Sequence, residues 1–264
     1  MAVIGITGGA GSGKSFVAKL AAENFDMLHI DTDRLARTQM MPGGASYAGV
    51  AQAFPDCLKH SRNVPDDRKT SGDISTVVSN ETNGEMIGAK KEKTADNSAS
   101  GDLPEIDRAA LAARVFNDSE ALEKLESLTH PHVRETVESL IEGSKGLFSH
   151  VLIETAILAD AGYCPLCDAV WYVTAPEEDR KKRLTERGYD EARIKSVFDS
   201  QPTDERYRET TTYEIKNGED ADEENILEQI RAILKDMGIP ETNAEDEDEE
   251  EDDDERRQKI EDKR

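Results

Sequence analysis

The chain has 264 residues, of which 36% are hydrophobic, and its formal net charge is −24 at pH 7. This length suffices for one α/β domain with insertions or for two small domains. So strong a negative charge argues against general binding to nucleic acid or to an anionic membrane surface. With no run of about 18 apolar residues, and a start that leads directly into a strand pattern instead of a secretory signal, we expect a cytoplasmic protein.

A glycine-rich loop follows the first apolar run. Residues 2–7 have the pattern of a strand, and residues 8–15 then fit the G-x-x-x-x-G-K-[ST] phosphate-binding loop before a helical pattern begins. In such a loop the backbone N–H groups and the positive end of the helix dipole point at a bound anion. The sequence therefore predicts an α/β fold of the P-loop NTPase type, with three layers and a parallel sheet.

The same loop predicts an ATP site. Lys14 is expected to neutralise β- and γ-phosphate oxygens, and the Ser15 hydroxyl to hold Mg²⁺. The residues expected to bind ATP are Gly9, Ala10, Gly11, Ser12, Gly13, Lys14, Ser15 and Phe16.

Two aspartates follow the second predicted strand, residues 27–30. Ligands of open α/β sheets bind beyond the carboxyl ends of the strands, so Asp31 and Asp33 are expected near the phosphate loop. A carboxylate there accepts a proton from an attacking hydroxyl or holds Mg²⁺ through water. The alternative is a turn followed by a helix cap, where aspartate is also favoured.

These two motifs together resemble the opening of the dephospho-coenzyme A kinases. The resemblance lies in residues 6–15 and in residues 30–37, and the second block is the more telling because many P-loop kinases share the first. Such enzymes phosphorylate the ribose 3′-hydroxyl of dephospho-coenzyme A with ATP and Mg²⁺. The resemblance implies that Asp33 is the catalytic base and that Arg37 contacts the acceptor. Asp31 is counted among the acceptor-side residues, and Lys14 among the catalytic ones.

The resemblance is interrupted between residues 59 and 104. This stretch is polar, and no aromatic residue lies between Phe54 and Phe116. It offers too little apolar area to offset the entropy of ordering, so we expect a largely disordered insertion. The resemblance resumes at Ile106.

Helical periodicity dominates residues 105–145, which the resemblance marks as the substrate-binding region. Pro131 is expected to open a new helix at its first turn. By the resemblance His130 and Arg134 contact the acceptor, although His130 has the alternative of a hydrogen bond to neighbouring backbone. The residues expected on apolar faces are Leu111, Val115, Phe116, Leu122, Leu125, Leu128, Val133, Val137, Leu140 and Ile141.

Two further strands are predicted at residues 151–153 and 169–173. Glu154 falls at the carboxyl end of the first, where the resembled family usually has an aspartate. Whether Glu154 reaches the metal or the ribose hydroxyl stays open. Cys164 and Cys167 have a C-x-x-C spacing, but a single pair carries no metal or redox assignment.

An arginine strip marks the next helix, which is expected to begin at Thr174 with a capping box. Arg180, Arg183 and Arg187 are spaced to lie on one side, and Arg183 and Arg187 are expected to grip the triphosphate. By resemblance, residues 176–205 form a lid that closes over ATP. The alternative is a solvated basic face that pairs with nearby glutamates.

The match to the family weakens beyond Gln201. Residues 207–218 do not keep the sequence motifs that the family has in this stretch, so the residues that contact adenine stay undefined. The final helix is expected to end at Gly238. The acidic tail, residues 241–264, is expected to stay solvated. We therefore expect a kinase domain over residues 1–240.

The predicted function is that of an ATP-dependent and Mg²⁺-dependent dephospho-coenzyme A kinase. Two alternatives stay open. One is a kinase of the same fold for another small acceptor, such as a nucleoside monophosphate. The other is a nucleotide-binding protein that has lost transfer activity.

Overall fold

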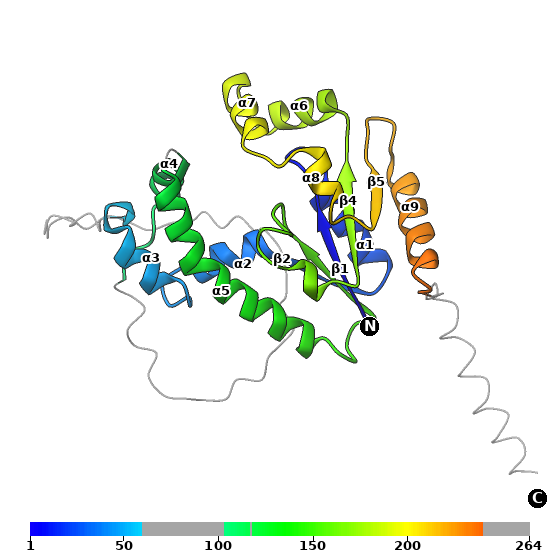
Figure 1. Ribbon diagram of the computed structural model, residues 1–264, viewed down its shortest axis with the longest axis horizontal. Coiled ribbons are helices and arrows are strands. Elements are labelled where there is room, and N and C mark those ends of the chain that lie inside the picture. Colours follow the sequence, from blue (N-terminus) through cyan, green and yellow to red (C-terminus); the bar gives the residue numbers. More distant parts are fainter. Residues whose placement is uncertain (60–102, 117, 240–264) are drawn as a thin grey trace, which may run out of the picture. The chain divides into compact units, whose positions relative to one another are not determined.

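The computed structural model describes residues 1–59, 103–116 and 118–239 (Figure 1). The expected insertion lies outside these residues, apart from Lys59, Leu103 and Pro104, and the expected acidic tail lies outside them entirely. None of the helices in the described ranges is long and apolar enough to cross a lipid bilayer.

Five parallel strands form one sheet in the order β2-β3-β1-β4-β5. The strands are β1 (Ala2–Thr7), β2 (Met27–Asp31), β3 (His150–Glu154), β4 (Ala169–Thr174) and β5 (Tyr213–Lys216). The first four confirm the predicted strands. The sequence analysis missed β5 because this four-residue edge strand has only one fully buried residue, Ile215, and so lacks an apolar run.

The helices lie between the strands and after them. They are α1 (Lys14–Asn24), α2 (Thr32–Gln39), α3 (Tyr47–Ala53), α4 (Arg108–Phe116), α5 (Ser119–Gly143), α6 (Glu177–Glu186), α7 (Glu191–Asp199), α8 (Asp204–Arg208) and α9 (Glu223–Asp236). Gly238 follows α9 with a φ of 72°, the left-handed conformation expected just past a helix end.

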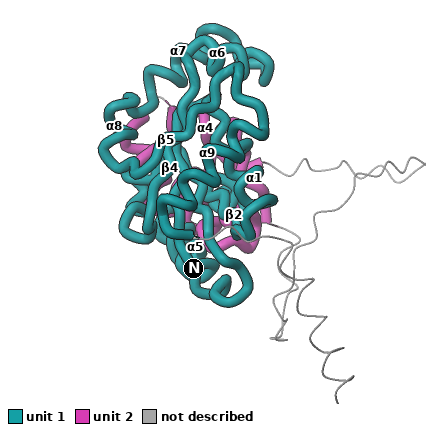
Figure 2. Tube along the Cα trace, turned by 90° about the vertical axis from the view of Figure 1, so that its right-hand side faces the viewer, with its two compact units in different colours: residues 1–38, 130–264 teal, residues 39–129 magenta. Residues whose placement is uncertain are grey.

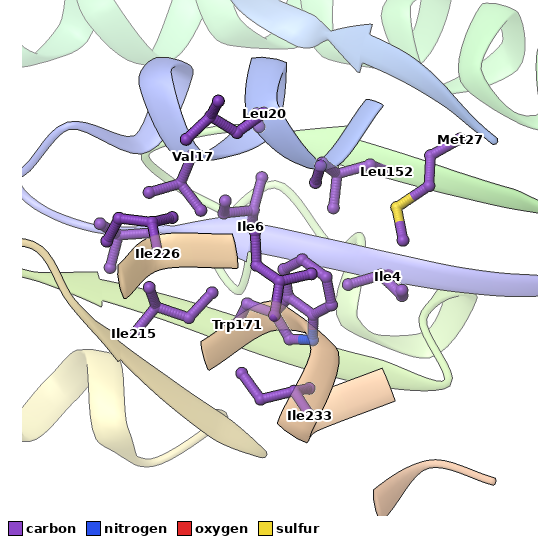
Figure 3. Packing of buried hydrophobic residues seen from close by; sticks show 14 of the residues in the cluster. Ile4, Ile6, Val17, Leu20, Met27, Leu152, Trp171, Ile215, Ile226 and Ile233 are labelled. Carbon is purple, nitrogen blue, oxygen red and sulfur yellow. The ribbon is translucent and has the colours of Figure 1, made fainter. Parts of the chain in front are cut away.

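One face of the sheet packs against α1 and α9. Figure 3 shows side chains from these two helices gathered around Ile6 and Trp171, which are both fully buried. The opposite face is covered by the second half of α5, through Val133 and Val137, and by residues that follow β3. Sheet and helices therefore form the three-layer arrangement that the sequence predicted.

Leu152 tests how much this core contributes to stability. It is fully buried on β3, an inner strand between β2 and β1, in the cluster that packs on α1 and α9. Leu152→Ala is expected to lower the free energy of unfolding by about 3 kcal/mol, because it removes buried methyl groups and leaves a cavity. Leu147→Ala, at a side chain that is 73% exposed, is the control and is expected to change it by less than about 0.5 kcal/mol. Urea titration of both variants measures the difference.

Pro131 does not begin a helix, so that prediction was wrong. It lies inside the continuous helix α5. A proline within a helix costs about 3 kcal/mol. The burial of Val133 and Val137 after it, and the packing of Leu125 and Leu128 before it, offset that cost. The helical periodicity also placed three residues on apolar faces that are in fact largely exposed, Phe116, Leu122 and Leu140.

The expected capping box at Thr174 is also absent. Helix α6 begins after Pro176, which is extended and cannot supply a side-chain cap. Thr174 ends β4 instead, and its hydroxyl donates to Glu214 on the neighbouring strand β5. The cross-strand bond explains why the threonine side chain is unavailable to the helix.

The described chain divides into two compact units, coloured separately in Figure 2. The first, residues 1–38 and 130–264, contains the sheet and the phosphate loop. The second, residues 39–129, has its own small core. That core is built on Tyr47, Val50, Phe54, Cys57, Ile106 and Leu111.

Candidate active site

The phosphate loop connects β1 to α1, and its last glycine has a required conformation. Gly13 precedes the helix with a φ of 91°, in the left-handed region, and an added Cβ would collide with the Asn217 side chain. The helix then begins at Lys14, so the N–H groups of Lys14 and Ser15 have no acceptor within the helix and, together with the helix dipole, favour the binding of an anion there.

Side chains distant in sequence fix this loop by binding its carbonyl oxygens. The Asn217 amide donates to the Ser12 carbonyl at 2.8 Å, and Arg183 donates to the Gly11 carbonyl at 3.1 Å and to the Asn217 carbonyl at 2.9 Å. Arg180 donates from Nε to the Ala10 carbonyl at 3.0 Å. The carbonyl oxygens of Ala10, Gly11 and Ser12 are thereby occupied by side-chain donors.

The arginine strip therefore divides between two tasks. Arg183, expected on the triphosphate, has its guanidinium on the loop carbonyls, whereas Arg187 lines the cleft beside the loop. The basic residues of α6 that pair with glutamates are Lys181, at 2.7 Å from Glu177 and 3.3 Å from Glu178, and Lys182, at 2.5 Å from Glu219. The alternative of a basic face that pairs with glutamates therefore describes the lysines of α6 but not Arg183 or Arg187.

Gln201 contacts the loop from the segment that follows α7. Its Oε1 accepts the Ala10 N–H at 2.6 Å and a second bond from Arg180 at 3.1 Å. One loop amide is thus satisfied by a side chain in this structure. Neither Gln201 nor Asn217 was assigned a contact from the sequence. A polar residue shortly after an amphipathic helix and an Asn-Gly pair after a strand are weak signals on their own.

A cleft of about 390 Å³ lies at the carboxyl ends of the strands. It brings together the predicted residues Asp31, Asp33, Arg37 and Glu154 with the loop residues Ala10, Gly11, Gly13, Lys14 and Ser15. Gly9, Ser12 and Phe16 belong to the same segment but do not line this cleft. The Ser12 hydroxyl is buried without a hydrogen-bond partner in the described part of the chain, and Phe16 is 38% exposed.

The charges in the cleft alter one another. Burial raises the pKa of Asp33, the neighbouring Asp31 raises it further, and Lys14 and Arg37 oppose the shift. Burial lowers the pKa of Lys14, while Glu154 and Asp33 oppose that change. Asp31 also accepts the Arg34 N–H at 2.9 Å, so it caps α2, as the alternative expected, and it lines the cleft as well.

Glu154 is held by two side chains. Its Oε1 accepts the Ser15 hydroxyl at 2.5 Å, and its Oε2 lies 2.9 Å from Nε2 of His29. Burial disfavours the charged form of Glu154, but the hydrogen bonds from His29 and Ser15 outweigh it and lower the pKa of the carboxyl. The sequence analysis left His29 out because a histidine inside a strand carries no motif.

Comparison of the chain with known proteins identifies its family. The sequence profile of the dephospho-CoA kinases matches residues 2–63 and 91–223. The chain belongs to this family. The dephospho-CoA kinase of Moorella thermoacetica is 34% identical over 190 residues, which cover 71% of this chain and 69% of that one. The dephospho-CoA kinase of Corynebacterium glutamicum is 30% identical over 241 residues, covering 90% and 98%.

Solved structures agree with the fold of this kinase. TT1252 from Thermus thermophilus aligns with a TM-score of 0.62 and 25% identity over 89% of this chain and 97% of that one. A dephospho-CoA kinase from Campylobacter jejuni aligns with a TM-score of 0.50 and 22% identity over 88% and 96%, and supports the fold alone. Together with the parallel sheet, these findings confirm the predicted α/β P-loop fold.

Two predicted acceptor residues of the kinase lie outside this cleft. His130 and Arg134 are on α5, and neither is among the residues that line it. Arg134 donates to the Gly162 carbonyl at 2.9 Å and pairs with Glu138 on the next turn. The structure thus gives Arg134 local contacts within the first unit, and the contact of either residue with an acceptor stays a prediction.

The cysteine pair of the kinase has no feature of a metal site. Cys164 and Cys167 are free thiols, burial raises the pKa of Cys167 to about 12, and its thiol donates to the Tyr163 carbonyl. Throughout the described residues, no cluster of three or more His, Cys, Asp or Glu side chains could hold a metal ion.

Proposed function

We propose that the protein is a dephospho-CoA kinase, which transfers the γ-phosphoryl group of ATP to the ribose 3′-hydroxyl of dephospho-coenzyme A to give coenzyme A and ADP. The observation that carries the proposal is the cleft in which Lys14, Ser15 and Asp33 face the same space, in a chain of this family. A phosphate site and a carboxylate base in one cleft are what phosphoryl transfer to a hydroxyl requires.

Asp33 acts as the base in this proposal. Its carboxylate accepts the proton of the attacking hydroxyl, and a pKa raised by burial makes it a stronger base than an exposed aspartate. Lys14 neutralises charge on the transferred phosphoryl group, and Arg187 adds a second cation in the same cleft. Asp31 and Arg37 line the acceptor side.

Mg²⁺ fits the donors present in the cleft. Ser15 and Glu154 offer oxygen atoms, which Mg²⁺ prefers, and this ion usually binds through one or two protein groups together with water and phosphate oxygens. Ser15 would hold it directly, and Glu154 orients the Ser15 hydroxyl. When bound, the ion neutralises charge on the phosphate oxygens.

The organisation of the chain follows from this proposal. Residues 1–240 are the kinase domain, within which residues 105–145 contribute to acceptor binding and residues 176–205 act as the lid. The contacts of Arg180 and Arg183 with the phosphate loop support a lid coupled to the nucleotide site. His130 and Arg134 are proposed as acceptor contacts that form during turnover.

A product assay tests the function. Purified protein is incubated with ATP and Mg²⁺, with and without dephospho-coenzyme A, and ADP release is followed while mass spectrometry detects coenzyme A. Coenzyme A formed only when both substrates are present is the expected result. ADP release with a nucleoside monophosphate but not with dephospho-coenzyme A would point to a kinase for another acceptor. Binding of ATP without any product would point to an inactive nucleotide-binding protein.

A further inference from the structure

The register of the sheet places His29 beside Glu154. In the parallel pairing of β2 with β3, His29 is opposite Leu152 and Asp31 is opposite Glu154. Alternate residues of a strand share a face, so His29 and Glu154 lie on the face that carries Leu152 and Met27, which are both buried against α1. Along β2, His29 therefore lies between Met27, which belongs to the hydrophobic core, and Asp31, which lines the cleft.

The contacts around Glu154 form a short chain of hydrogen bonds. His29 lies 2.9 Å from one carboxylate oxygen, and the Ser15 hydroxyl lies 2.5 Å from the other. A carboxylate only accepts hydrogen bonds, so Nε2 of His29 carries the proton and donates. The side chain of Glu154 is 8% exposed and that of His29 is 26% exposed, so the imidazole closes one side of the carboxylate.

This arrangement restricts a flexible side chain. A glutamate has several rotatable bonds, and fixing them costs free energy that a single hydrogen bond to Ser15 barely offsets. A buried carboxylate with an unsatisfied oxygen is also costly. The second bond, from His29, keeps the carboxylate in place when Lys14, whose charge acts on Glu154, competes for it.

We propose that His29 is a positioning residue that acts through Glu154 and Ser15 to set how strongly Mg²⁺ strengthens ATP binding. The inference rests on the proposed function only in that Ser15 holds Mg²⁺ in the nucleotide complex. His29 is not among the residues that line the cleft. It fixes the carboxylate that orients the Ser15 hydroxyl.

The test compares ATP binding in Mg²⁺ with ATP binding in EDTA by calorimetry. The ratio of the two affinities is expected to fall about 10-fold in His29→Val, the size of effect typical for residues that orient metal ligands. His29→Asn is expected to match it, because its shorter amide does not reach the position of Nε2. In His29→Gln the amide nitrogen reaches that position, so the ratio is expected to stay within about threefold of the wild type. Affinity in EDTA is expected to be unchanged in all three.

Two further variants separate positioning from a general effect on the sheet. His150→Val removes an imidazole that lies on β3 and accepts the Ala2 N–H at 3.3 Å. This variant is expected to leave the ratio of the two ATP affinities unchanged. Adding His29→Val to Glu154→Gln is expected to lower the ratio by less than about twofold beyond Glu154→Gln alone, because His29 acts only through the carboxylate.

Three results would overturn the inference: a wild-type ratio near one, an unchanged ratio in His29→Val and His29→Asn, or an equal loss on adding His29→Val to Glu154→Gln. The ratio is measured without any acceptor. A wild-type protein that makes no coenzyme A would therefore reject the proposed function and still leave the role of His29 to be decided by binding.

Discussion

Replacing Asp33 with asparagine is expected to lower kcat by about 1000-fold while ATP affinity stays within about threefold of the wild type. Asparagine has nearly the same shape but cannot accept a proton from the attacking hydroxyl. Asp33 lines the cleft with Lys14 and does not belong to the phosphate loop. Single-turnover transfer, measured alongside ATP binding, separates the loss of chemistry from a loss of nucleotide.

The pH profile gives this prediction a second readout. The proposed base works only when ionised, so kcat/KM of the wild type is expected to fall as pH decreases through the raised pKa of Asp33. That acidic limb is expected to be absent from the residual activity of Asp33→Asn.

The free energy of unfolding is expected to depend on pH in the opposite sense to kcat/KM. Because the folded-state pKa of Asp33 is raised, the native state binds more protons than the unfolded chain between the unfolded and folded pKa values. Stability is therefore lost as pH rises through that window, and the ionised carboxylate disfavours folding above it. Asp33→Asn is expected to melt at pH 7 no lower than the wild type.

Asp56→Asn, which changes the net charge equally at an exposed residue, serves as the control for Asp33→Asn. It is expected to leave turnover and the pH profile unchanged. If Asp33→Asn kept near-normal turnover with ATP bound, another group would have to be the base, and Asp31 would be the next candidate in the cleft.

The parts of the fold that the sequence predicted are those encoded locally. The phosphate loop is one contiguous motif, and four strands have apolar runs that need no partner to be recognised. The rule that ligands bind at the carboxyl ends of parallel strands then placed Asp31, Asp33 and Glu154 near the loop, and the cleft contains all three.

The parts that the sequence did not predict depend on pairs far apart in the chain. Asn217 and Ser12 are separated by 205 residues, Gln201 and Ala10 by 191, and His29 and Glu154 by 125. Such contacts follow from the strand register and from tertiary packing, which no local pattern encodes. The prediction that Pro131 begins a helix was wrong for a related reason. The packing of both halves of α5 overrides the strong preference of proline for the first turn of a helix.

The arginine strip illustrates the same limit within one helix. The spacing of Arg180, Arg183 and Arg187 correctly places basic side chains toward the phosphate loop. It cannot tell whether they meet phosphate oxygens or backbone carbonyls, because both are hydrogen-bond acceptors at the same edge of the sheet. In this structure Arg180 and Arg183 bind carbonyls, and Arg187 is the one that lines the cleft.

Lys14→Met is expected to lower both ATP affinity and turnover, in contrast to Asp33→Asn. Lys14 lines the cleft at the start of α1, where a bound anion also meets the helix dipole. Loss of its charge-assisted hydrogen bonds is expected to weaken ATP binding by about 30-fold, and loss of charge neutralisation during transfer to lower kcat by about 100-fold or more. Calorimetry and coenzyme A formation measure the two effects.

Lys19→Met supplies the matched control on the same helix. Its ammonium group is 3.6 Å from Glu23, and its side chain is 70% exposed, so neither ATP binding nor turnover is expected to change.

The melting temperature decides what a loss of activity in Lys14→Met means. Burial lowers the pKa of Lys14 in the folded state, so the unfolded chain binds more protons between that lowered pKa and the ordinary pKa of lysine. Below the ordinary pKa the buried charge therefore opposes folding. Glu154 keeps its bonds from Ser15 and His29 when Lys14 is replaced. Lys14→Met is therefore expected to melt at the same temperature as the wild type or higher, a gain in stability at the expense of function. A melting temperature that fell together with activity would instead mean that Lys14 mainly balances the buried carboxylates.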